Sequence, residues 1–154
     1  MDKSTSIVKP DAAAMRAANI NPATGLATDY LNLFNEYIML AEMVSEGNME
    51  PNILQYWQPI DYETHFAQSG FVSLDVVLAA YRTLPPDEKQ EFEDAVNRMM
   101  DLILDHQKLL AGTPDTIIEI KQQRDHIATL ISDPVHAKDI DSSDTQAEID
   151  ALFD

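Results

Sequence analysis

Apolar residues recur at intervals of three and four through most of this chain, which is the spacing of one face of an α-helix. Near the C-terminal end of the body, residues 114–132, the spacing predicts a buried face of Ile117, Ile120, Ile127, Leu130 and Ile131. In residues 86–111 it predicts a longer stripe of Phe92, Val96, Met99, Leu102, Ile103, His106 and Leu110. No stretch alternates apolar and polar residues between turn signals, so no strand is predicted.

Capping residues, glycines and prolines indicate where these helices begin and end. Thr28 and Gly47 bracket a helix over residues 29–46, whose apolar side chains cover more than one stripe and predict a central position. Asp61 and Gly70 bracket a shorter helix, and Pro86 is typical of the first position of another. The remaining predicted helices span residues 61–68, 74–84, 86–111 and 114–132.

These patterns predict an all-α fold, a four- to five-helix bundle over residues 28–132. Residues 1–27 hold few large apolar residues and several Asp, Pro and Gly residues, so we expect a flexible extended arm with one helical turn near residues 12–18. Residues 133–144 are rich in Ser and Asp and predict a polar linker. Residues 145–154 predict a short amphipathic helix that closes the chain.

The net charge of the chain limits the classes of macromolecule that we expect as partners. The chain has 27 Asp and Glu residues against ten Lys and Arg residues, a net charge of −17. Phosphate recognition needs clustered basic residues, so neither nucleic acid nor an anionic membrane is an expected partner. An acidic protein is instead drawn to a partner with a basic surface. No stretch approaches the roughly 18 apolar residues of a membrane span and no secretory leader is evident, so the expected location is the cytoplasm.

The chain has no cysteine, which excludes disulfides, thiolate metal sites and cysteine nucleophiles. Its four histidines are not arranged in the Glu-x-x-His pairs of carboxylate-bridged metal bundles, so neither a metal nor a cofactor is expected. His106 falls within an apolar stripe and is predicted to be a core histidine bonded to a neighbour. Trp57, Asp61 and His65 form the densest polar and aromatic group of the body; a pocket is one interpretation, and a capped helix with an exposed His65 is the other.

The C-terminal segment carries the strongest functional signal. Thr145 and Glu148 have the spacing of a capping box, in which each side chain satisfies a backbone N–H at a helix start. Ile149, Leu152 and Phe153 follow at i, i+3 and i+4, so they share one face. A helix this short is marginal alone in water and must fold against another surface.

Residues 145–153, TQAEIDALF, resemble the SQxEIDALL peptide of the bacterial flagellar motor switch protein, which binds phosphorylated receiver-domain response regulators. The pattern is matched by Gln146, Glu148, Ile149, Asp150, Ala151 and Leu152, while Thr145 replaces Ser and Phe153 replaces Leu. That family carries the peptide at its N-terminus, whereas here it is C-terminal. The resemblance implies a partner with a basic-rimmed apolar groove, contacted by Gln146, Glu148, Ile149, Asp150, Leu152 and Phe153.

The predicted function is therefore that of a non-enzymatic signalling adaptor, with no catalytic residues, that binds a response regulator through its C-terminal helix. One alternative is a response-regulator phosphatase, which would use an acid and an amide four residues apart on one helix, here Glu119 and Gln123. Another is a structural or homo-oligomeric helical protein whose tail packs on its own core. Residues 21–36 (NPATGLATDYLNLFNE) resemble small uncharacterised bacterial helical proteins, and this resemblance implies no activity.

Overall fold

The computed structural model describes residues 7–109 and 114–132 of the chain, and this part is mostly helical, which confirms the predicted helical class. Two short strands and a 3-10 turn lie between the first two helices. In chain order the elements are α1 (Ala12–Ala17), β1 (Ile20–Asn21), β2 (Leu26–Ala27), η2 (Thr28–Tyr30), α2 (Leu31–Ser45), η3 (Pro51–Tyr56), α3 (Tyr62–Gln68), α4 (Leu74–Arg82), α5 (Pro86–Lys108) and α6 (Pro114–Ser132).

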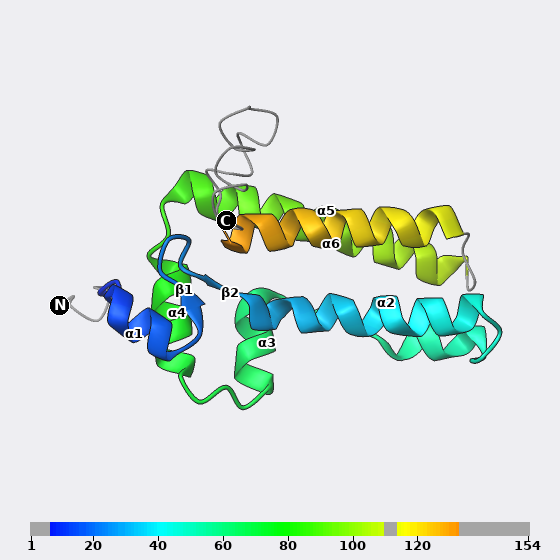
Figure 1. The fold of residues 1–154 in the computed structure, drawn as a ribbon, viewed down its shortest axis with the longest axis horizontal. Helices are drawn as coiled ribbons and strands as arrows, with labels where there is room; N and C mark the ends of the chain where they lie inside the picture. The colour runs from blue at the N-terminus through cyan, green and yellow to red at the C-terminus, as the bar shows by residue number, and fades with distance from the viewer. Residues whose placement is uncertain (1–6, 110–113, 133–154) are drawn as a thin grey trace, which may run out of the picture.

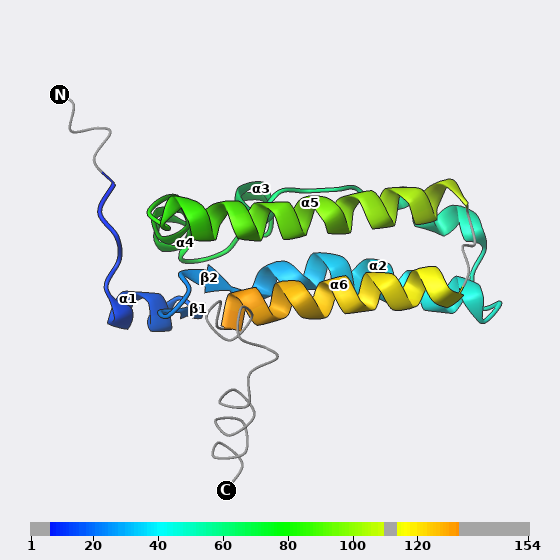
Figure 2. The same ribbon diagram turned by 90° about the horizontal axis from the view of Figure 1, so that it is seen from above.

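The three long helices α2, α5 and α6 run side by side along the length of the molecule, and η3 packs on α2 (Figures 1 and 2). Helices α5 and α6 form an antiparallel pair, and α2 packs along α6. Helices α1, α3 and α4 and the β-hairpin lie where α2 begins and α6 ends. The hairpin therefore lies beside the point from which the C-terminal segment leaves the body.

Most helix boundaries follow the predicted capping chemistry. The Asp61 carboxylate accepts the Thr64 backbone N–H at 2.8 Å and caps α3. Pro86 is the first residue of α5, where a missing N–H costs nothing. The start of α2 differs from the prediction, because Thr28 belongs to the 3-10 turn η2 and α2 begins only at Leu31.

The core is continuous along the long helices and richest in aromatic rings near α3. All five residues of the buried face predicted for α6 are buried, as are Phe92, Val96, Met99, Ile103 and His106 of α5. Tyr62 lies at the centre of the aromatic part, with its ring centroid 4.8 Å from that of Phe66 and 5.2 Å from that of Tyr30. Helix α2 has six buried residues, which agrees with its predicted central position.

The N-terminal region differs from the predicted extended arm. The helical turn expected near residues 12–18 is α1, but the residues after it form an antiparallel hairpin that pairs Ile20 with Ala27. The buried apolar side chains of this region are Met15, Ala18, Ile20, Leu26 and Ala27. Strands of two residues are too short for an alternating pattern to show, and small side chains such as alanine carry little hydrophobic signal, so the sequence pattern missed this packing.

The hairpin holds the C-terminal end of α6. The Thr24 hydroxyl donates to the Ile131 carbonyl oxygen at 2.6 Å, and the Asn21 amide donates to the Ser132 carbonyl oxygen at 2.7 Å. The last carbonyls of a helix have no partner within the helix. These two bonds supply partners and set the point on the body from which residues 133–154 continue.

We expect Thr24→Val to lower the free energy of unfolding by about 1–3 kcal/mol, because a buried polar group left without a partner costs about that much. The Thr24 hydroxyl is buried and also accepts the Leu26 N–H at 3.2 Å, so the valine leaves two backbone groups unpaired. Urea denaturation would measure the loss. Thr129→Val is the matched control, since the Thr129 hydroxyl donates to the Asp125 carbonyl oxygen within α6 at an exposed position; an equal loss in both variants would contradict the prediction.

Candidate functional site

The six residues predicted to bind a partner lie outside the described residues, as do the linker 133–144 and the end of the stripe at Leu110. The structure describes the helical body of the protein, to which these six residues are joined through the linker. Two surface grooves within residues 7–109 and 114–132, one polar and one apolar, are lined by residues that the sequence pointed to, Gln123 in the first and Trp57 in the second.

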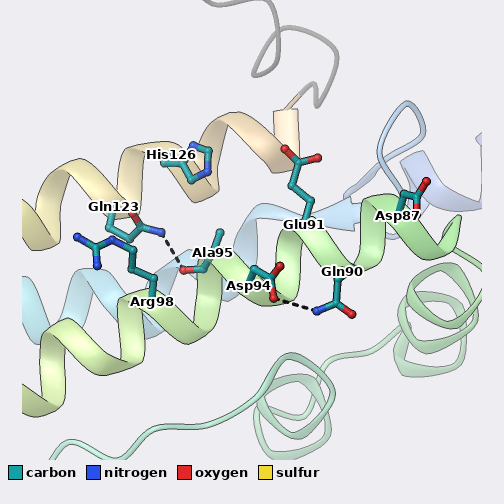
Figure 3. A pocket seen from close by; sticks show the side chains of 8 residues that line it. All are labelled: Asp87, Gln90, Glu91, Asp94, Ala95, Arg98, Gln123 and His126. Carbon is teal, nitrogen blue, oxygen red and sulfur yellow. Dashed lines mark hydrogen bonds between the residues drawn. The ribbon is translucent and has the colours of Figure 1, made fainter.

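The polar groove runs between α5 and α6 and has a volume of about 510 Å³ (Figure 3). Acidic side chains of α5 line one part of it, and Arg98 and His126 lie farther along. The Gln123 amide crosses between the helices and donates to the Ala95 carbonyl oxygen at 2.9 Å. The lining residues are Asp87, Gln90, Glu91, Asp94, Ala95, Arg98, Gln123 and His126.

The two residues considered for phosphatase chemistry have different surroundings on α6. Gln123 lines the polar groove, but its NH₂ group is committed to Ala95. Glu119 is exposed on α6 and does not line this groove. An amide that orients an attacking water must present its polar atoms to the reacting group. Gln123 serves here as a link between two helices, an arrangement that periodicity along one helix could not reveal.

The apolar groove lies between α2 and the segment that returns along it after Gly47, and we call it the α2–η3 groove. Its volume is about 440 Å³. The indole N–H of Trp57 donates to the Leu33 carbonyl oxygen at 2.8 Å and fixes the segment against α2. Tyr56 beside it is 76% exposed, an unusual exposure for so large a ring. The lining residues are Leu33, Glu36, Leu40, Ile53, Tyr56, Trp57, Gln58 and Ile60.

A buried glutamine secures the far side of this segment. The Gln107 side chain donates to the carbonyl oxygens of Leu54 and Trp57, at 2.8 and 3.0 Å. Its own backbone carbonyl accepts the Gln55 amide at 3.0 Å. Irregular backbone cannot satisfy its own carbonyls, so α5 satisfies them instead. Three hydrogen bonds to Gln107 of α5 therefore fix the segment that forms one wall of the groove.

Trp57, Asp61 and His65 do not share one pocket. Trp57 lines the α2–η3 groove, whereas Asp61 lines a separate cavity of about 160 Å³ beside Tyr62. The predicted exposure of His65 is wrong, because its side chain is only 13% exposed and its Nε2 lies 3.0 Å from an Asp29 carboxylate oxygen. Asp29 and His65 are 36 residues apart, so only the packing of η2 on α3 brings them together.

His106 is confirmed as a core histidine. It is fully buried, and its Nδ1 lies 2.5 Å from the hydroxyl oxygen of Tyr37 on α2. Within the part of the chain that the structure describes, its Nε2 has no hydrogen-bond partner. Burial lowers the pKa of His106 below its usual value and raises the pKa of Tyr37, so both groups stay neutral near pH 7.

Among the described residues, no group of three or more His, Asp and Glu side chains could hold a metal ion, and no helix there is long and apolar enough to cross a membrane. The chain was also compared with known proteins: no family model, no curated protein and no solved structure matches it.

Proposed function

We propose that this protein is a non-enzymatic signalling adaptor that binds a receiver-domain response regulator through residues 145–154. The observation that carries the proposal is the pattern of Thr145 to Phe153, in which a capping box precedes an apolar triplet and matches the regulator-binding peptide of the flagellar motor switch protein. In this proposal Ile149, Leu152 and Phe153 enter an apolar groove of the partner, while Glu148 and Asp150 face basic residues at its rim.

The distribution of charge supports a basic partner. Residues 133–154 hold seven of the acidic residues and one lysine, a net charge of −6, and the rest of the chain is acidic as well. Such a segment is repelled by its own body and attracted by a basic surface. Association with the regulator should therefore weaken as salt rises, since exposed charges are screened beyond about 8 Å at physiological ionic strength.

The anchoring of α6 supports the same proposal. Because Thr24 and Asn21 hold the last carbonyls of α6, the segment starts from a defined point on a rigid body. The twelve residues 133–144 then separate the body from the proposed docking helix. This spacing lets the helix enter a groove on a second protein without a clash between the two bodies.

The test is a titration of the full chain with phosphorylated receiver domains from the same organism, measured by calorimetry. Burial of three large apolar side chains contributes about 1.5–3 kcal/mol each before the ordering costs, so we expect weak, micromolar binding. Ile149→Asp combined with Leu152→Asp should weaken binding more than tenfold. The matched control, Ser142→Asp with Ser143→Asp, adds the same charge in the linker; equal binding by both double variants would refute the proposal.

A further inference from the structure

We infer that the α2–η3 groove is a docking site for the chain's own residues 145–154, and that this intramolecular complex competes with the regulator for the same apolar triplet. The inference rests on the proposed function for its regulatory meaning, but the docking itself is a property of the chain alone. Residues 145–154 would occupy an apolar groove that the described residues leave open.

The lining of the groove fits an amphipathic helix. Leu33 and Leu40 are seven residues apart, so they lie two turns apart on the same edge of α2, with Glu36 between them. The exposed ring of Tyr56 and the partly buried Ile53 form the opposite wall. The stripe of Ile149, Leu152 and Phe153 covers little more than one turn, so a groove two helical turns long can receive all three side chains.

The occupant reaches the groove from where the described chain ends. The Thr24 bond to Ile131 shows that α6 ends beside the hairpin that leads directly into α2, and Leu33 lies in the first turn of α2. The edge of α2 that meets α6 is marked by Asn35, whose side-chain oxygen accepts a 2.8 Å bond from Arg124. Leu33 and Leu40 lie on the other edge of the helix, so the linker must pass around α2.

The linker is long enough for that path. A helix with its side chains is about 10–12 Å thick. A random-coil chain of twelve residues has a root-mean-square span of roughly 20 Å and reaches about 40 Å when fully extended. The linker can therefore cross α2 and place the helix along the groove without being stretched. At such a distance the local concentration of the occupant is on the order of millimolar, so even weak contacts produce a populated closed state.

Charge keeps the closed state weak. Glu36 lies in the groove, and residues 145–154, which would enter it, hold three acidic and no basic residues, so like charges oppose the apolar attraction. Salt screens this repulsion. Raising the salt concentration should therefore favour the closed state, whereas it weakens binding to a basic regulator. The two interactions respond to salt in opposite directions, which distinguishes them experimentally.

Because the chain has no cysteine, a single introduced cysteine can carry a spin label, and because it has one tryptophan, the indole N–H resonance belongs to Trp57 alone. A nitroxide spin label on Ala147→Cys would lie on the side of the helix away from the apolar triplet. In the full chain it should broaden the Trp57 indole N–H resonance, and Leu152→Asp with Phe153→Asp should restore that signal. Broadening should increase as the salt concentration rises from about 0.01 to 0.15 M.

Two controls make the outcome decisive. Tyr56→Ser should reduce the broadening without loss of stability, whereas Val72→Ser, at a fully exposed position in another part of the surface, should not. Contacts between molecules are detected in a mixture of spin-labelled chains without isotope enrichment and isotope-enriched chains that carry no spin label. An unbroadened indole signal, a signal insensitive to the tail substitutions, or broadening that arises only between molecules would overturn the inference.

The regulatory part is tested by the regulator titration. If half of the molecules are closed, the apparent affinity for the regulator is about twofold lower than that of the open form, and Tyr56→Ser should recover this factor. Broadening without regulator binding would refute the proposed function and leave the docking intact. Regulator binding without broadening would refute the docking alone.

Discussion

Tyr62→Ala should destabilise the protein by about 3–5 kcal/mol, the range for truncating a large buried aromatic residue. The Tyr62 side chain is 3% exposed, and its ring stacks on that of Tyr81 with the centroids 4.5 Å apart. It also meets Phe66 and Phe92 edge to face. Removing this ring opens a cavity where α3, α4 and α5 meet. The midpoint of thermal unfolding should fall by roughly 10 °C for a protein of this size.

Tyr62→Phe separates the ring from its hydroxyl. The hydroxyl oxygen accepts the Ala27 backbone N–H at 2.9 Å and connects α3 to the hairpin. Phenylalanine keeps the ring and leaves that buried N–H unpaired, so we expect a loss of about 1–3 kcal/mol. Tyr56→Ala, at an exposed ring, should change stability by no more than about 0.5 kcal/mol. Equal losses for Tyr62→Phe and Tyr62→Ala would contradict a contribution from ring packing.

The second large effect is a loss of stability in mild acid caused by His106. Its pKa is lowered by burial in the folded state, so below pH 6.5 the unfolded chain binds a proton that the folded chain does not. Stability is therefore unaffected by this group above pH 6.5. It falls by up to about 1.4 kcal/mol per pH unit as the pH drops from 6.5 toward the lowered folded pKa.

The loss follows from the burial of His106, and among the described residues no hydrogen-bond partner of Nε2 offsets it. In the neutral ring, Nδ1 donates to or accepts from the Tyr37 hydroxyl according to the tautomer, whereas the protonated ring carries an N–H on both nitrogens, and Nε2 has no acceptor among the described residues. Replacing both partners, as His106→Leu with Tyr37→Phe, removes the titrating group without stranding either one. We expect urea denaturation at pH 7.5 and 5.5 to show a smaller pH dependence in this double variant. His126→Gln, at an exposed histidine, is the control; a pH dependence unchanged by the double variant would contradict the assignment.

Local signals predicted the helical elements well because their causes are local. Asp61 caps α3 by reaching a backbone N–H three residues away, and Pro86 starts α5 through its own ring geometry. The buried face of α6 follows from 3.6-residue periodicity alone. The predicted start of α2 was too early. Thr28 is a suitable N-cap residue, but residues 28–30 form the 3-10 turn η2, in which Tyr30 packs among the aromatic rings.

The candidate site likewise has one part that the sequence predicted and one part that depends on the tertiary structure. The apolar triplet of Ile149, Leu152 and Phe153 is legible in the sequence because it lies within five residues, whereas the groove proposed to receive it is assembled from α2 and a segment that includes Trp57. No pattern along one segment shows which face another segment leaves uncovered. The commitment of Gln123 to Ala95 is equally invisible along the chain.

By itself, then, the sequence of this protein determined which long segments are helical, which faces they bury, and that its C-terminal residues carry an apolar triplet at helical spacing. Those properties depend on spacing and capping over a few residues. Only the tertiary structure decided that residues 12–27 join the core, that Asp29 pairs with His65, and that an apolar groove remains open beside α2. These depend on contacts between residues far apart in the chain, whose burial and hydrogen bonding are settled when the helices pack.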